Sequence, residues 1–173
     1  MTADPSEHLK RANALLNKKQ NSLLLYAALE IRFALERMTQ SELINAEKAT
    51  RKSLDWYEAS KKRRELSRIS NGKADVPNDI IMKSKVTGEK VVIGEYKPLD
   101  LNRVKKIQGR LGDLLHPKVG LMLGIWNDPW YLETRRFLLE SHKYLSELRK
   151  DNLPYYYYEN LDHIEMVPKS DNS

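Results

Sequence analysis

The chain contains no cysteine among its 173 residues. Disulfide bonds and zinc sites built on thiolates are therefore excluded, and the composition suits a reducing cytosol. Long hydrophobic runs are also lacking, because the longest apolar stretch, residues 23–29, includes a tyrosine and is followed directly by charged residues. A membrane-spanning helix needs about 20 apolar residues, and the first residues lack the basic and apolar regions of a signal peptide. We therefore expect no membrane segment and a cytoplasmic location.

Positive charge is in excess, with 30 Lys and Arg against 24 Asp and Glu, a net charge of +6 and a pI near 9.4. Such an excess favours polyanions such as RNA, although many helical proteins without a nucleic-acid partner carry as much. Hydrophobic residues make up 40% of the chain, which is enough for the core of one domain.

Apolar residues recur at helical spacing from the start of the chain. Asp4, Pro5 and Glu7 are typical of a helix start, and the helix they open has one apolar face: Leu9, Ala12, Leu15 and Leu16. Residues 23–38 are the most apolar segment, with one row at Leu24, Ala27, Ala28, Ile31, Leu35 and Met38 and a second at Leu25, Leu29 and Phe33. A helix that is apolar on most sides is normally the central helix of a bundle.

A third helical stretch is expected to begin at Ser41-Glu42 and to end at Asn71-Gly72, as one helix or as two with a break near Ser53. The apolar period then changes. Residues 80–82 and 91–93 flank Thr87-Gly88, which predicts a β-hairpin at about residues 80–97.

Two further helices follow the hairpin. One starts after Asp100, has an apolar face and ends at His116-Pro117; that face is Leu101, Val104, Ile107, Leu111, Leu114 and Leu115. The last starts at Asp128-Pro129, and its buried face is expected to be Leu132, Phe137, Leu138, Ser141, Leu145 and Leu148. The fold class predicted is all-α, an up-down bundle of four to five helices with a small inserted β-hairpin. Residues 1–153 would form this domain, and residues 154–173 a frayed, tyrosine-rich tail.

Arg110 and His116 are the strongest candidates for catalytic residues. They lie six positions apart near the end of a helix whose polar face also carries Arg103, Lys105 and Lys106. A guanidinium binds phosphate, and an imidazole transfers protons near neutral pH. Together they can cleave RNA without a metal, with the RNA's own 2′-hydroxyl as the nucleophile.

The chain resembles the HEPN (higher eukaryote and prokaryote nucleotide-binding) superfamily of short helical bundles. Residues 24–37 are similar to the long early helices of that group, and residues 111–117 include His116 where the Arg-to-His motif of the group is expected. The resemblance covers about two thirds of the chain at the level of helix pattern.

The resemblance implies a metal-independent endoribonuclease that works as a homodimer, with two copies of the motif facing one cleft. Arg110 would bind the scissile phosphate, and His116 would act as general acid or base. It also implies a toxin–antitoxin or phage-defence setting, with an antitoxin as protein partner. We expect no cofactor and no metal.

Simpler interpretations of the same residues remain open. A second Arg-to-His spacing joins Arg135 or Arg136 to His142, and His116 suits the negative end of a helix dipole. Arg103 and Lys106 are candidate RNA-binding residues, as are Lys61, Lys62, Arg63 and Arg64, which are equally typical of a solvated helix end. Glu30 and Glu36 are expected in salt bridges, the latter with Arg32.

Leu121, Trp126 and Trp130 belong to an apolar segment that is expected either to pack before the last helix or to form an oligomer interface. Tyrosines 155–158 can stack bases or anchor the tail on the bundle. The alternative function is therefore a non-catalytic RNA-binding or dimerisation module. A DNA-binding regulator is disfavoured because no helix-turn-helix spacing is present.

Overall fold

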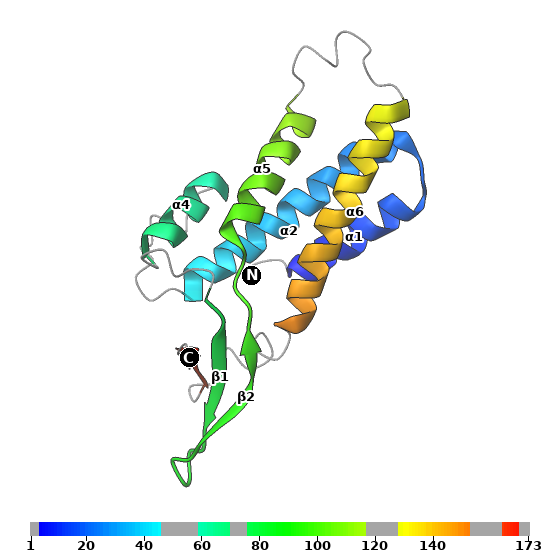
Figure 1. Cartoon of the computed structure of the whole chain (residues 1–173). Helices are drawn as coiled ribbons and strands as arrows, with labels where there is room; N and C mark the ends of the chain where they lie inside the picture. The colour runs from blue at the N-terminus through cyan, green and yellow to red at the C-terminus, as the bar shows by residue number, and fades with distance from the viewer. Residues whose placement is uncertain (1–3, 46–58, 70–75, 117–127, 153–163, 170–173) are drawn as a thin grey trace.

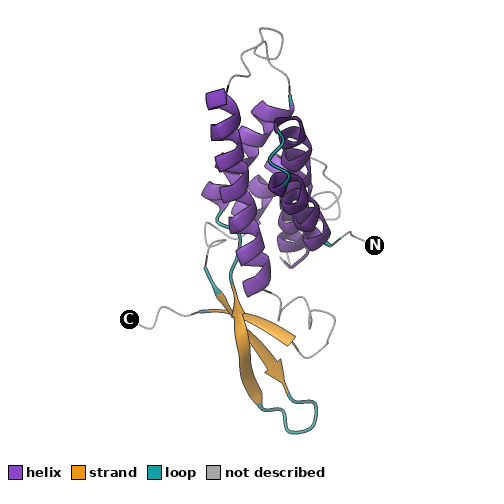
Figure 2. Cartoon of the chain, turned by 90° about the vertical axis from the view of Figure 1, so that its right-hand side faces the viewer, coloured by secondary structure: helices purple, strands orange, loops and turns teal. Residues whose placement is uncertain are grey.

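The computed structural model describes residues 4–45, 59–69, 76–116, 128–152 and 164–169, which form the helices and strands of Figure 1. The helices are α1 (Pro5–Asn17), the short 3-10 helix η1 (Asn21–Leu23), α2 (Leu24–Asn45), α4 (Ala59–Ile69), α5 (Leu101–Leu115) and α6 (Asp128–Asp151). The strands are β1 (Asn78–Lys83), β2 (Lys90–Tyr96) and β3 (Ile164–Pro168). The helices pack as one bundle, and the sheet projects from one end of it (Figure 2). The predicted helical bundle with a small hairpin is confirmed.

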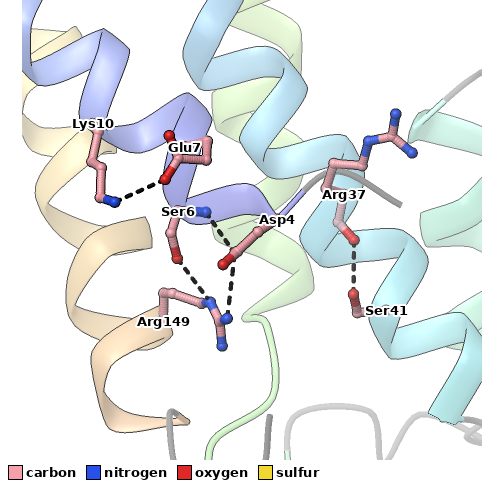
Figure 3. A network of polar contacts seen from close by, with 7 residues as sticks. All are labelled: Asp4, Ser6, Glu7, Lys10, Arg37, Ser41 and Arg149. Atoms are coloured by element: carbon pink, nitrogen blue, oxygen red, sulfur yellow. Dashed lines mark hydrogen bonds and ion pairs between the residues drawn. The ribbon is translucent and has the colours of Figure 1, made fainter. Parts of the chain in front are cut away.

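Helix α1 begins as its sequence predicts. The Asp4 carboxylate accepts a hydrogen bond from the Ser6 amide at 2.9 Å, and Pro5 occupies the first turn. The Glu7 carboxylate instead accepts from Lys10 at 2.8 Å (Figure 3). The expected apolar face of the helix is turned inward, with Leu9, Ala12 and Leu16 buried.

Helix α2 is the centre of the bundle, since it contacts α1, α4, α5 and α6. All six residues of its predicted first row are buried. The helix continues through Ser41, so the prediction that a third helix begins there is wrong. The Ser41 hydroxyl donates to the Arg37 carbonyl at 3.1 Å, a bond that a serine makes within a continuous helix (Figure 3). The predicted break near Ser53 lies outside the described residues.

The second apolar row of α2 is only partly covered. Leu29 is 36% exposed and Phe33 is 39% exposed, and the neighbouring Tyr26 is 63% exposed. A bundle helix is covered only on the sides where neighbouring helices lie, so a wide apolar surface exceeds what those neighbours can bury.

Helices α5 and α6 close the bundle. The Asp100 carboxylate accepts from the backbone amides of Asn102 and Arg103, both at 2.9 Å, and so caps α5 as predicted. Helix α6 buries the expected face with one exception: Leu132 is 64% exposed. Leu132 precedes the fully buried Leu138 by six positions, which turns it about 120° around the helix axis, away from the core.

The hairpin forms where the change of period predicts it. Strands β1 and β2 pair antiparallel, with Ile81 opposite Val92, and the turn between them contains Gly88 at φ +74°. A positive φ is strained for residues with a side chain, which explains glycine at this position.

Strand β3 corrects, for residues 164–168, the prediction that the tail is frayed. It pairs antiparallel with β1, so that the described sheet has the order β2-β1-β3. Its ion pair between Glu165 and Lys90 of β2, at 2.7 Å, crosses the middle strand. The tyrosine run at residues 155–158 lies outside the described residues.

Polar contacts join the two ends of the chain's helical part. The Arg149 guanidinium on α6 donates to the Ser6 hydroxyl and to the Asp4 carboxylate, both at 3.3 Å (Figure 3). Burial opposes ionisation of Asp4, but the hydrogen bonds from Ser6 and the charge of Arg149 outweigh it and lower the pKa of the carboxyl group.

Candidate nucleic-acid interface

The outer face of α5 is mainly cationic, and its central apolar residues turn toward the core. Val104, Ile107 and Leu111 are buried, while the positive residues on the other sides of the helix are exposed: Arg103, Lys105, Lys106 and Arg110. Helix α6 exposes charges of both signs, such as Arg136, Glu140 and Lys143, whereas α5 exposes four positive residues and one negative residue, Asp113.

Two arginines of α5 lie over aromatic rings of α6. The guanidinium carbon of Arg103 is 4.0 Å from the centre of the Tyr144 ring, and that of Arg110 is 4.6 Å from the centre of the Phe137 ring. The helices run antiparallel, so a step of seven residues forward on α5 matches a step of seven back on α6. Cation–π contacts of this kind fix a long, flexible side chain in one place.

Neither of these guanidinium groups has a carboxylate partner among the described residues. Four arginines elsewhere do pair with carboxylates: Arg11 with Glu30 at 3.0 Å, Arg32 with Glu36 at 2.9 Å, Arg68 with Glu65 at 2.8 Å and Arg149 with Asp4 at 3.3 Å. An exposed guanidinium that is fixed by a ring and keeps its N–H donors available can bind an external anion.

The Tyr144 ring is itself held in place. Its hydroxyl oxygen accepts a hydrogen bond from the Asp100 amide at 3.0 Å, at the residue that caps α5. Burial raises the pKa of Tyr144, so the phenol stays protonated at neutral pH. Arg103 therefore lies over a neutral ring of α6, and that ring is hydrogen-bonded to the start of α5.

The two candidate catalytic residues are not brought together within one chain. Arg110 is exposed on α5, and His116 is the exposed C-cap residue, whose backbone amide donates to the Gly112 carbonyl at 2.9 Å. Six residues of helix separate two side chains by about 9 Å along the axis and about 120° around it.

The alternative Arg-to-His pair on α6 has a structural role. Arg135 donates to the Leu16 carbonyl at 2.9 Å, and the ring of His142 lies 3.0 Å from the Leu9 carbonyl. Both side chains thus bind backbone oxygens of α1, so Arg135 and His142 act within the fold and are not available to a substrate.

The basic segment at the start of α4 is not a uniformly solvated helix end. Lys62 is only 5% exposed, and its ammonium group donates to the Gln40 side chain at 3.0 Å. Burial lowers the pKa of Lys62. Arg63 is half-buried, while Lys61 and Arg64 are exposed. The prediction that all four residues meet RNA phosphates is therefore corrected for Lys62, whose amine faces the protein.

The predicted interface is described only in part, because Leu121 and Trp126 lie outside the described residues. Trp130 is half-buried, and its ring meets the Tyr131 ring edge to face at 5.1 Å. Leu132, exposed at 64%, follows directly. This start of α6 lies at the same end of the bundle as the end of α5, where His116 stands (Figure 1).

His8 and Arg11 of α1 form a polar cluster with Glu30 of α2, and the sequence analysis did not predict these two partners. Glu30 accepts from His8 Nδ1 at 2.7 Å and from Arg11 Nε at 3.0 Å. Arg11 Nη2 also lies 2.7 Å from His8 Nδ1, so the three side chains form one polar cluster. The expected salt bridges of Glu30 and Glu36 are confirmed. The partners of Glu30 are 19 and 22 positions away, and their only signal is their shared face on α1.

No group of three or more metal-ligating side chains is present in the described ranges, and no helix there is long and apolar enough to cross a membrane. Comparisons with protein-family models, with curated proteins and with solved structures find no match to this chain.

Proposed function

We propose that this protein is a HEPN-like endoribonuclease that binds RNA along the cationic face of α5 and cleaves it, as a homodimer, with Arg110 and His116. The observation that carries the proposal is the pair of exposed arginines on α5 that lie over aromatic rings and have no carboxylate partner within the described residues. Backbone phosphates are the anions that a row of such cations along one helix fits best.

The homodimer is what the family resemblance implies, with two copies of the motif facing one cleft. A phosphate held at Arg110 of one protomer would be reached by His116 of the other. The exposed Leu132 beside Trp130, at the same end of the bundle, supports an interface there.

The chemistry would need no metal. The 2′-hydroxyl attacks the neighbouring phosphorus and loses its proton to one His116, while the bond to the 5′ oxygen breaks and that oxygen gains a proton from the second His116. Arg110 stabilises the extra negative charge on the phosphoryl oxygens. The products are a 2′,3′-cyclic phosphate and a 5′-hydroxyl. RNA as substrate implies a cytoplasmic protein, and the family resemblance adds a toxin–antitoxin or phage-defence setting with an antitoxin partner.

Cleavage of a fluorescent single-stranded RNA in EDTA tests the proposal. We expect Arg110→Ala and His116→Ala each to slow cleavage by about 100-fold or more. A strand with 2′-deoxy sugars should resist. The matched control is Arg136→Ala, which removes another exposed arginine and should leave the rate unchanged. Cleavage that survives both α5 substitutions, or that requires a divalent metal, contradicts the proposal.

A non-catalytic interaction module is the second candidate. It is favoured by the exposed apolar residues Tyr26, Phe33 and Leu132, which exceed what this bundle needs for its own core. A stable dimer without RNA cleavage would support it over the first.

A further inference from the structure

Arg103, like Arg110, differs from the lysines of α5 because its planar guanidinium lies over an aromatic ring, and Arg103 lies closer to its ring. Lys105 and Lys106 are point charges on flexible chains, which suit a phosphate of any nucleic acid. The Arg103 guanidinium lies 4.0 Å from the ring centre, a stacking distance, and the residue remains exposed.

We propose that Arg103, supported by Tyr144, is a stacking platform for an unpaired nucleobase, so that the protein selects single-stranded RNA; this rests on the proposed function. The ring covers one side of the guanidinium, and the other side is available to a base. Bases stack on guanidinium planes in single-stranded RNA, where each base offers a free face. In a duplex the faces are already taken by neighbouring base pairs.

The position of the platform fits a subsite beside the cleavage point. Arg103 precedes Arg110 by seven residues, or about 10 Å along the helix. At about 3.4 Å per stacked nucleotide, that distance corresponds to a base about three nucleotides from the phosphate at Arg110. The Tyr144 hydroxyl, anchored to the Asp100 amide at 3.0 Å, holds the ring so that no ordering is needed when RNA arrives.

Fluorescence anisotropy with a 12-nucleotide RNA, single-stranded and as a duplex, tests the platform at low salt. Arg103→Lys keeps the charge and removes the plane, so we expect single-strand affinity to fall about five- to tenfold and duplex affinity to stay unchanged. Lys106→Ala, the matched control, should weaken both RNAs alike. A strand with abasic sites should bind wild-type protein and Arg103→Lys equally.

A purely structural role of Arg103 would leave the ratio of single-strand to duplex affinity unmoved, because any loss of folded protein lowers both. If Arg103→Lys binds the single strand as tightly as wild type does, or if wild type binds both RNAs equally, the platform is wrong while RNA binding stands. If wild type binds neither RNA, the proposed function fails together with it.

Discussion

The side chain of Asn152 binds both backbone polar groups of Lys97. Its amide nitrogen donates to the Lys97 carbonyl at 2.7 Å, and its oxygen accepts from the Lys97 amide at 2.8 Å. Asn152 is 1% exposed. The contact joins the end of α6 to the link between β2 and α5, and with it the sheet to the bundle.

Replacing Asn152 with alanine should lower the free energy of unfolding by about 1–3 kcal/mol, because two partly buried hydrogen bonds to the Lys97 backbone are lost. Urea denaturation measures this. The control is Asp151→Asn, which breaks the exposed ion pair between Asp151 and the Lys97 ammonium and should change stability by less than about 1 kcal/mol. Equal effects of the two substitutions would show that the Asn152 contact adds nothing.

Helix starts were predictable from the sequence because their causes are local. Asp4 and Asp100 each cap a helix through an amide two residues along the chain, and that signal lies within one turn. Partners across the fold gave no such signal. Leu132 and Leu138 are equally apolar, and only the position of the neighbouring helices decides which of them is buried. Strand β3 pairs with residues that lie 82 to 90 positions earlier, and Arg103 contacts a ring on the next helix.

Acid should weaken the protein through Glu30. Burial opposes its ionisation, but the hydrogen bonds from Arg11 and His8 outweigh burial and hold its pKa below the ordinary 4.5. A lowered carboxyl pKa means that stabilisation is present above 4.5 and is lost as the pH falls through the lower, folded-state value. Glu30→Gln should therefore destabilise the protein by about 1–3 kcal/mol at pH 7 and much less near pH 3.

The comparison variant for Glu30 is Glu36→Gln, which breaks a pair with Arg32 one turn away on the same helix at 2.9 Å. An i,i+4 pair contributes about 0.3–0.5 kcal/mol, so its loss should be small at either pH. Urea unfolding of both variants at neutral and at acid pH measures the two losses of stability. A Glu30→Gln deficit that persists undiminished in acid would rule out the ionised Glu30 as its source.

Gly109 should be replaceable by alanine with a gain in stability. It lies within α5, and an added Cβ would meet nothing within 4 Å. Glycine in a helix costs about 0.5–1 kcal/mol relative to alanine, so the melting temperature should rise. Gly88→Ala should instead lower the melting temperature, because the φ of +74° at this position is strained for a residue with a side chain. If Gly109→Ala binds RNA more weakly while being more stable, the RNA backbone approaches this glycine closely.

Salt dependence should separate the cations that meet RNA from those that do not. Each phosphate contact contributes about −0.7 to the slope of log affinity against log salt for a single strand. Lys106→Ala should make the slope about 0.7 less steep, because Lys106 is exposed on α5. Lys62→Met should leave it unchanged, since the buried Lys62 ammonium donates to Gln40. A slope that falls with Lys62→Met would reverse this assignment.

The dimer that the proposed cleavage requires should depend on Leu132. An aspartate in place of this 64% exposed leucine would bring a charge into an apolar interface and so favour the monomer. Tyr26→Asp is the control, because Tyr26 is 63% exposed on a different helix. Sedimentation equilibrium should show a monomer for Leu132→Asp and a dimer for Tyr26→Asp and for wild type.

Because His116 of one protomer would act on a phosphate held by the other, the Leu132→Asp monomer should lose cleavage. It should still bind RNA through the α5 face of each chain, with anisotropy reporting a modest loss of affinity. Cleavage at the wild-type rate by a proven monomer would mean that both groups act from one chain, and it would overturn the composite site. A dimer that Tyr26→Asp disrupts instead would move the interface to α2.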